Sequence, residues 1–281
     1  MDIDELHRLI FSHGSRTYYN SSRLFPKAVR RDVFTLYAFV RVADNLVDDP
    51  PVHPDEFHAF RERWRAAMAG TPAGDWVIDP FVELGARRGF DPQWTEDFFA
   101  AMESDLVAQP CDSLEDVLRY TWGSAEVIGL FMLKLLDIPD EARPTACLLG
   151  RSMQFINFLR DVAEDHGLGR RYLPLGDGLK ELSPEGAQAD PEAFRRFLRG
   201  WTTVYHEWQE GARDGFGYLP WRFRLAVKTA SDLYNWTARV IQKEPMEVWK
   251  RKIKPSKTRI LITALGNVFF FPRKPGVRRS P

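Results

Sequence analysis

Apolar residues recur at helical spacing through almost the whole chain, whereas alternating runs typical of strands are scarce. Proline, which the first turn of a helix tolerates but its interior does not, separates the periodic segments. The three clearest apolar stripes are Val33, Leu36, Tyr37 and Val40; Val127, Leu130, Phe131 and Leu135; and Phe155, Ile156, Phe158, Leu159 and Val162. The pattern predicts an all-α fold built from a succession of long helices.

Prolines also indicate where individual helices begin and end. A helix that starts near Pro26 must end before Pro50 and Pro51. We expect loops at 72–74 and at 175–191, a stretch rich in Gly, Pro and Asp. Neither loop is typical of a domain linker and no internal repeat is evident, so residues 1–281 are expected to form a single domain.

The helix expected over residues 37–49 carries a polar stripe on an otherwise apolar surface. At about 100° per residue, four side chains fall on one line along this helix: Tyr37, Arg41, Asp44 and Asp48. A helix that is apolar over most of its circumference is buried, so these carboxylates would face an interior cleft. An unpaired buried carboxylate is costly, and a cation is therefore expected to meet them.

A second segment, residues 153–165, has the same design. Its polar stripe comprises Gln154, Asn157, Asp161 and Asp165, and apolar residues form the opposite face. One Asp-x-x-x-Asp pair on a helix is usually a solvated surface. Two copies on two mostly apolar helices, with Arg41 beside the first and Arg160 beside the second, indicate a functional site.

Such paired carboxylates suit the ionisation of a diphosphate assisted by Mg²⁺. Mg²⁺ takes one or two protein carboxylates plus substrate phosphate oxygens at about 2.0–2.1 Å. Carboxylates at i and i+4 lie about 5–6 Å apart at their Cβ atoms, close enough to hold one or two ions over a shared diphosphate. Bridging ions neutralise the leaving group and make cleavage of the carbon–oxygen bond feasible.

Composition narrows the classes of protein to consider. Lys plus Arg and Asp plus Glu both number 39, so the net charge is zero and does not favour a nucleic-acid partner. Cys111 and Cys147 show no CxxC spacing and indicate neither a disulfide framework nor a zinc site. The first residues lack the pattern of a signal peptide, and the apolar stretch 260–271 is shorter than the ~20 residues that span a bilayer. We expect a cytoplasmic protein that is not an integral membrane protein.

The residues around both acidic stripes resemble the two aspartate-rich signatures of the squalene/phytoene synthase family. Residues 41–48 are similar to the first signature and residues 157–165 to the second, and the likeness extends over roughly residues 10–260. One residue departs from the pattern, because Asn45 stands where relatives often have a second adjacent aspartate. This departure bears on the number of metal ions and not on the reaction.

The resemblance implies a single-domain, all-α isoprenoid-synthase helical bundle with a central active-site cavity. It implies that Mg²⁺, with Mn²⁺ as an alternative, is held by Asp44, Asp48, Asp161 and Asp165. The implied diphosphate contacts, where arginine forks suit phosphate oxygens, are Ser15, Arg16, Arg41, Gln154, Arg160 and Arg170. The implied catalytic residues are Tyr37, Arg41, Tyr120, Asn157, Tyr172 and Tyr234. For each tyrosine taken alone, packing in the core is an equally good interpretation.

The implied reaction joins two geranylgeranyl diphosphates head to head to give phytoene through a cyclopropylcarbinyl (prephytoene) diphosphate, without NADPH. One alternative is a squalene or dehydrosqualene synthase that acts on farnesyl diphosphate. A terpene cyclase, which shares the fold and the metal, and a non-catalytic assembly factor of the same fold are two others. The presence of all four aspartates favours an enzyme. The oligomeric state stays open.

Small residues interrupt an otherwise bulky helix in the middle of the chain, at Gly123, Ser124, Ala125 and Gly129. They permit either close packing of helices or room for a long prenyl tail, and the sequence favours neither.

The C-terminal part of the chain combines apolar residues with many cations. Residues 260–262 and 268–271 are apolar, and the stretches that flank them are basic. Because this combination suits anionic lipid, we expect peripheral contact with a membrane. Residues 260–265 are nevertheless expected to pack into the helical bundle.

Overall fold

The computed structural model describes residues 3–14, 25–48 and 52–269, and within these ranges every regular element is a helix. The α-helices are α1 (Ile3–Gly14), α3 (Lys27–Asp48), α4 (Pro54–Met68), α5 (Ile78–Arg88), α6 (Pro92–Leu106), α7 (Leu114–Thr121), α8 (Val127–Leu135), α9 (Arg143–Arg160), α10 (Val162–Gly167), α11 (Pro184–Ala189), α12 (Pro191–Ala212), α13 (Trp221–Lys243), α14 (Glu247–Lys250) and α15 (Lys257–Val268). The other elements are the π-helix η1 (Trp122–Glu126) and the 3-10 helices η2 (Asp140–Ala142) and η3 (Arg213–Gly217). The predicted all-α fold is confirmed.

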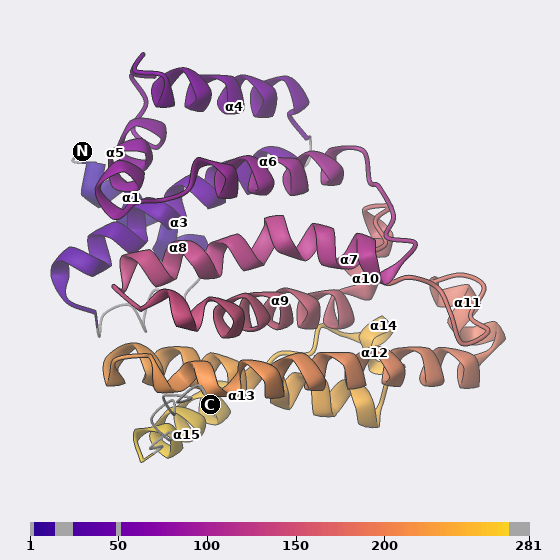
Figure 1. The fold of residues 1–281 in the computed structure, drawn as a ribbon. Helices are drawn as coiled ribbons and strands as arrows, with labels where there is room; N and C mark the ends of the chain where they lie inside the picture. The colour runs from indigo at the N-terminus through magenta and orange to yellow at the C-terminus, as the bar shows by residue number, and fades with distance from the viewer. Residues whose placement is uncertain (1–2, 15–24, 49–51, 270–281) are drawn as a thin grey trace, which may run out of the picture.

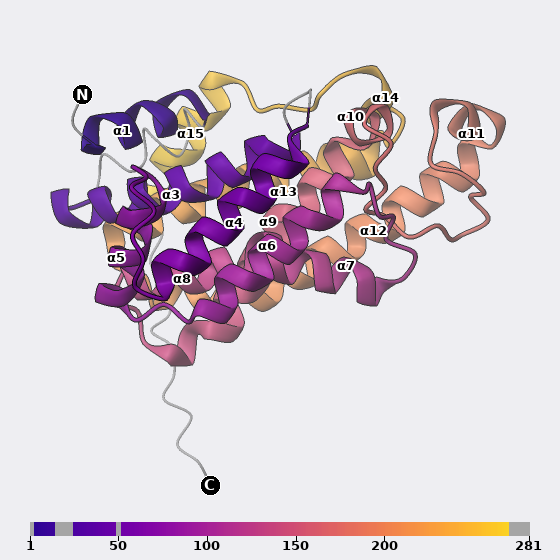
Figure 2. The same cartoon turned by 90° about the horizontal axis from the view of Figure 1, so that it is seen from above.

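The helices are stacked in successive layers (Figure 1). From one side to the other these are α4, then α6 with α3, then α7 and α8, then α9, then α12, and finally α13 with α15. The view from above shows that the long helices run in similar directions and that α11 lies at one end of the stack (Figure 2).

Helices begin where proline and capping signals coincide. The Asp91 carboxylate accepts a hydrogen bond from the main-chain N–H of Gln93, and α6 starts at Pro92. The stretch 175–191 was expected to be a loop, and this expectation is wrong for α11, because Ser183 caps that helix by accepting from Gly186 N at 2.9 Å. The predicted helix between the prolines at 26 and 50 is confirmed as α3.

Two hydrophobic clusters form the core, and one tyrosine packs against both. In the first cluster, built by α3 to α6 and α8, Phe39 stacks on Phe81 with ring centroids 3.7 Å apart. In the second, built mainly by α9, α12 and α13, Phe155 and Phe197 are buried. Tyr120 at the end of α7 contacts both clusters, so the two cores join beside this residue.

A buried ion-pair cluster fixes α3 against α5. The Asp32 carboxylate accepts hydrogen bonds at 2.6 Å from both Arg87 Nη2 and Arg88 Nη2, and its side chain is 4% exposed. Burial acts to raise the pKa of Asp32, but the hydrogen bonds from the two arginines outweigh this effect and lower it. The N-terminal half of α3 is therefore held in place by charge as well as by apolar packing.

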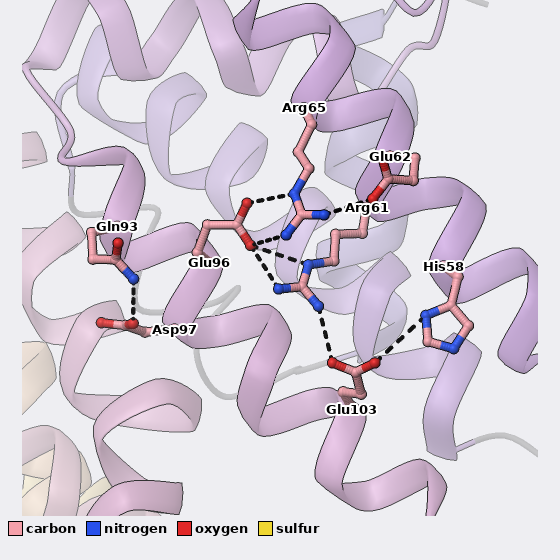
Figure 3. A network of polar contacts seen from close by, with 8 residues as sticks. All are labelled: His58, Arg61, Glu62, Arg65, Gln93, Glu96, Asp97 and Glu103. Carbon is pink, nitrogen blue, oxygen red and sulfur yellow. Dashed lines mark hydrogen bonds and ion pairs between the residues drawn. The ribbon is translucent and has the colours of Figure 1, made fainter.

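A second ionic network joins α4 to α6 (Figure 3). Arg61 and Arg65 of α4 both donate to Glu96 of α6, with Nη2 of Arg61 at 2.8 Å and Nε of Arg65 at 2.7 Å. Arg61 also donates to Glu103 at 3.0 Å, and the ring of His58 lies 3.8 Å from the same carboxylate. Since several charges share partners, this network fixes α4 more firmly than an isolated surface pair would.

Glycines permit the close approach of η1 and α8 to their neighbours. A Cβ atom on Gly123 would lie 2.2 Å from the main-chain oxygen of Asp97 in α6, and one on Gly129 would lie 2.9 Å from the main-chain oxygen of Ala146 in α9. The indole N–H of Trp122 adds a hydrogen bond of 2.6 Å to the Asp97 carboxylate. These two glycines serve helix packing, which is one of the two interpretations that the sequence allowed.

The last helix differs from its expected placement. Residues 260–265 were expected to pack into the bundle, yet Leu261, Ile262 and Leu265 are exposed by 57–65%, because α15 turns other residues toward α13. Within the described ranges, no helix is both long enough and apolar enough to cross a membrane.

Candidate active site at the ends of the acidic helices

The first acidic stripe lies on the last turns of α3 and is paired with arginines. Arg41 Nη1 donates to Asp44 Oδ2 at 2.7 Å, one turn further along the same helix. Arg170, in the segment after α10, donates from Nη1 to Asp48 Oδ1 at 2.5 Å and from Nη2 to the main-chain oxygen of Val47 at 2.8 Å. The end of α3 is thus bound by a residue from the second half of the chain.

The second acidic stripe does not lie on one continuous helix. The sequence predicts a helix through residues 153–165, but α9 ends at Arg160 and α10 begins at Val162, with Asp161 at φ −100° and ψ 17° between them. Hydrogen bonds from Asp161 N to Asn157 O and from Asp165 N to Asp161 O continue across this break. The break therefore does not separate the two aspartates, which stay one turn apart.

Asp161 sits in a cluster of cations at this break. Its carboxylate accepts from Arg160 Nε at 2.8 Å and from Arg160 Nη2 at 2.5 Å, and Lys252 Nζ lies 3.3 Å away. Lys252, which also binds Glu164, was not among the predicted site residues. A fork from arginine onto a carboxylate is the geometry that also suits a phosphate group.

Among the four aspartates predicted to bind metal, Asp44 and Asp165 have the negative charges that nearby cations balance least. Asp165 makes no ion pair with any described residue, and burial together with the charges of Asp161 and Glu164 raises its pKa to about 8. Burial and the neighbouring charge of Asp48 raise the pKa of Asp44 to about 7, despite the ion pair with Arg41. Both carboxylates would gain from a further cation.

A buried aspartate that the sequence did not single out lies nearby. Asp105, at the end of α6, accepts a hydrogen bond on each carboxylate oxygen, from Tyr120 OH at 2.7 Å and from Tyr172 OH at 2.6 Å. Burial raises its pKa to about 6, although both tyrosine hydroxyls act in the opposite direction. The Tyr172 ring stacks on Phe158 with centroids 4.4 Å apart. Two predicted tyrosines are therefore held by one carboxylate.

The remaining predicted residues are placed as follows. Asn157 Nδ2 donates to Gln154 Oε1 at 3.4 Å, and Asn157 Oδ1 is buried without a hydrogen-bond partner in the described structure. Tyr37 is partly buried against the first core cluster and Tyr234 against the second. The predicted diphosphate contacts Ser15 and Arg16 lie outside the described residues.

The residues present fit a bound Mg²⁺. No three His, Cys, Asp or Glu side chains in residues 3–14, 25–48 and 52–269 lie close enough together to hold one ion. Mg²⁺, however, commonly takes only one or two protein carboxylates and completes its shell with water and phosphate oxygens. Asp165 has no ion pair with a described residue, and the pKa of Asp44 is raised despite its ion pair with Arg41. Together with the unpartnered amide oxygen of Asn157, these carboxylates are hard oxygen donors of the kind that Mg²⁺ takes.

A groove of about 470 Å³ between α12 and α13 lies apart from this arrangement. Its lining includes His206, Arg213 and Arg239 and none of the predicted site residues. The candidate active site is accordingly defined by the aspartates and their arginine partners, not by this groove.

Comparison with known proteins identifies the class. The family model for squalene/phytoene synthase matches residues 11–259, and the chain belongs to this family. It is therefore a prenyltransferase.

Individual relatives agree with this assignment. The 15-cis-phytoene synthase of Paracoccus sp. (strain N81106 / MBIC 01143) is 30% identical over 258 residues, which cover 88% of this chain and 84% of the relative. The 15-cis-phytoene synthase of Pantoea ananas is 28% identical over 275 residues, which cover 90% of this chain and 88% of the relative.

Solved structures show the same fold. A dehydrosqualene synthase crystallised with a ligand superposes with a TM-score of 0.81 at 20% identity, covering 94% of this chain and 95% of the other. The squalene synthase HpnC from Alicyclobacillus acidocaldarius gives a TM-score of 0.77 at 20% identity, covering 86% and 94% of the two chains.

Proposed function

We propose that this prenyltransferase condenses two geranylgeranyl diphosphates head to head to phytoene, through prephytoene diphosphate and with Mg²⁺ as cofactor. The observation that carries the proposal is the charge arrangement at the acidic helix ends. Asp44 and Asp165 are short of positive charge, while Arg41, Arg160 and Arg170 stand beside the aspartates with guanidinium groups suited to a diphosphate. Relatives named as phytoene synthases support the choice of product.

The arginines bind and orient the diphosphates in this scheme. Arg41, Arg160 and Arg170 each bind an aspartate in the structure described. Asp44, Asp48, Asp161 and Asp165 would hold Mg²⁺, which would neutralise the diphosphate and assist its departure. With the carboxylates so engaged, the guanidinium groups could turn to phosphate oxygens, which offer the same paired acceptors.

The first step joins the two prenyl chains. The carbon–oxygen bond of one substrate breaks, and its diphosphate leaves with the electron pair. The double bond of the second substrate attacks the resulting allylic cation, and loss of one proton closes the cyclopropane ring. Tyr120, Tyr172 and Phe158 supply aromatic rings next to the charged cluster, where ring faces could stabilise a carbocation.

The second step consumes the cyclopropylcarbinyl diphosphate. The remaining diphosphate leaves with its electron pair, the ring opens and rearranges, and loss of a second proton gives the central double bond of phytoene. Neither step consumes a hydride, so the reaction does not require NADPH. A squalene synthase would instead quench the last cation with hydride.

Product analysis tests this proposal. Purified protein should be incubated with Mg²⁺ and either geranylgeranyl or farnesyl diphosphate, with and without NADPH, and the hydrocarbon identified by mass spectrometry. We expect phytoene from geranylgeranyl diphosphate, in equal yield with or without NADPH. Formation of squalene or dehydrosqualene from farnesyl diphosphate, with geranylgeranyl diphosphate ignored, would replace the proposed substrate and product while retaining the head-to-head reaction.

We also propose that the enzyme works in peripheral contact with a membrane. The prenyl tails of the substrates and the hydrocarbon product partition into lipid, so a surface that meets lipid would shorten their path through water.

A further inference from the structure

The outer face of α15 carries a continuous stripe of large apolar side chains. The stripe consists of Leu261, Ile262, Leu265, Val268 and Phe269, which are exposed by 61%, 65%, 57%, 53% and 78%. Their spacing places all five on one side of the helix, within an arc of about 120° at 100° per residue. None of the residues of α15 is fully buried.

The opposite face of α15 already has its partner. Asn267 Nδ2 donates to Asp232 Oδ2 at 2.8 Å and to Thr229 Oγ1 at 3.3 Å, both on α13. At the other end of the helix the Arg259 guanidinium lies 4.7 Å from the centre of the Trp236 ring. Because these polar and cation–π contacts attach α15 to the bundle, its apolar side chains point away from the core.

The part of the sequence that contains α15 carries cations and no carboxylates. After Glu247 the chain contains no Asp or Glu through to its end. Lys254, which precedes this helix, and Lys257, its first residue, are exposed and make no ion pair within the described residues. An apolar stripe next to uncompensated cations is the composition of a helix that lies in the interface of an anionic bilayer.

We propose that the outer face of α15 is a docking surface for a bilayer that contains anionic lipids. Lipid acyl chains would receive the apolar stripe, and lipid phosphates would pair with Lys254 and Lys257. A second copy of the chain suits this face less well, since α15 carries no carboxylate that could pair with Lys254 and Lys257 of the other copy in a two-fold contact. The role of the surface in delivering prenyl substrates rests on the proposed function; the docking itself does not.

Vesicle co-sedimentation of the full chain tests the surface directly. We expect wild-type protein to bind vesicles of phosphatidylcholine mixed with phosphatidylglycerol. The double variant Leu261→Ser/Leu265→Ser should bind at least roughly tenfold more weakly, since two apolar side chains no longer enter the lipid. The matched control Met68→Ser/Leu114→Ser, which changes two exposed apolar residues of α4 and α7, should bind as wild type does.

The charge requirement has its own pair of variants. Lys254→Gln/Lys257→Gln should weaken binding to the mixed vesicles about tenfold and leave binding to pure phosphatidylcholine unchanged. Lys180→Gln/Lys243→Gln, at exposed lysines elsewhere, should change neither. Circular dichroism should show native helix content in every variant.

Three outcomes would overturn the docking surface: wild-type protein that does not bind the mixed vesicles, unchanged binding by Leu261→Ser/Leu265→Ser, and a wild-type dimer in light scattering that this variant converts to a monomer. Turnover of detergent-dispersed geranylgeranyl diphosphate should be the same in all variants. Vesicle binding by a protein without prenyltransfer activity would keep the docking surface and refute the proposed function.

Discussion

Arg170 donates a hydrogen bond of 2.5 Å to the carboxylate of Asp48, although 122 residues separate them in the sequence. The main-chain N–H of Arg170 also donates to the main-chain oxygen of Asp165 at 2.8 Å. One residue therefore connects the end of α3 with the segment that follows α9. This tertiary contact holds the two acidic stripes beside one another, which the local sequence of neither helix could do.

Removing one carboxylate from either stripe should abolish turnover. We expect Asp48→Ala and Asp161→Ala each to lower the rate by at least about 10²-fold, because each deletes a proposed metal ligand and frees the arginine that it holds. The helical fold should remain by circular dichroism. The control Asp140→Ala removes an aspartate that is 61% exposed and pairs with Lys134, and it should retain full activity. Near-normal turnover of either site variant in excess Mg²⁺ would contradict the metal assignment.

Asp105 and Tyr172 should act as a coupled pair. Asp105→Asn replaces one acceptor oxygen by an amide, and Tyr172→Phe removes a donor, so each should lower the free energy of unfolding by about 1–2 kcal/mol and reduce turnover. In the double variant the two losses should be less than additive by roughly 0.5–1 kcal/mol. Urea denaturation of the four proteins of this cycle measures the coupling. Strict additivity would show that the hydrogen bond contributes nothing of its own.

Sequence periodicity located the acidic stripes because their spacing is local. Asp44 and Asp48 are one turn apart, so the pattern of α3 alone places them together. Asp105 is different, since its partners lie 15 and 67 residues away and no local pattern distinguishes it from a solvated acid. Lys252 was missed for the same reason, because its contact with Glu164 spans 88 residues.

Local breaks were harder to predict than helices. The interruption at Asp161 leaves the apolar face of α9 intact, and the cations around that residue come partly from the distant Lys252. By contrast, the sequence does indicate the start of α11, because Ser183 followed by Pro184 is typical of a helix N-terminus. The Gly, Pro and Asp residues around this pair favoured a loop instead.

Asp32 should make stability depend on pH in the acid range. Its folded-state pKa is lowered by Arg87 and Arg88, so the stabilisation is fully present above the unfolded-state pKa of about 3.9 and is lost as pH falls through the folded value. Asp32→Asn should cost about 3 kcal/mol at pH 7, because it leaves two arginines without their shared carboxylate. Denaturation of both proteins at pH 7 and near pH 3 checks this. The difference should shrink at the lower pH, and a constant difference would argue against the ion pairs as its cause.

Two glycine substitutions distinguish helix packing from a tunnel wall. In Gly123→Ala the new Cβ would lie 2.2 Å from the Asp97 main-chain oxygen and 2.8 Å from Ala101 Cβ, so η1 must move away from α6. We expect a loss of about 2–3 kcal/mol in the free energy of unfolding. In Gly266→Ala, on α15, no atom lies within 4 Å of the added Cβ, and a gain of about 0.5–1 kcal/mol is expected from the higher helix propensity of alanine. Thermal unfolding measures both.

Turnover of geranylgeranyl and farnesyl diphosphate by Gly123→Ala should fall by similar factors, since displacement of η1 affects the site regardless of tail length. Unchanged stability with a selective loss of the longer substrate would instead place Gly123 in the wall of a prenyl tunnel.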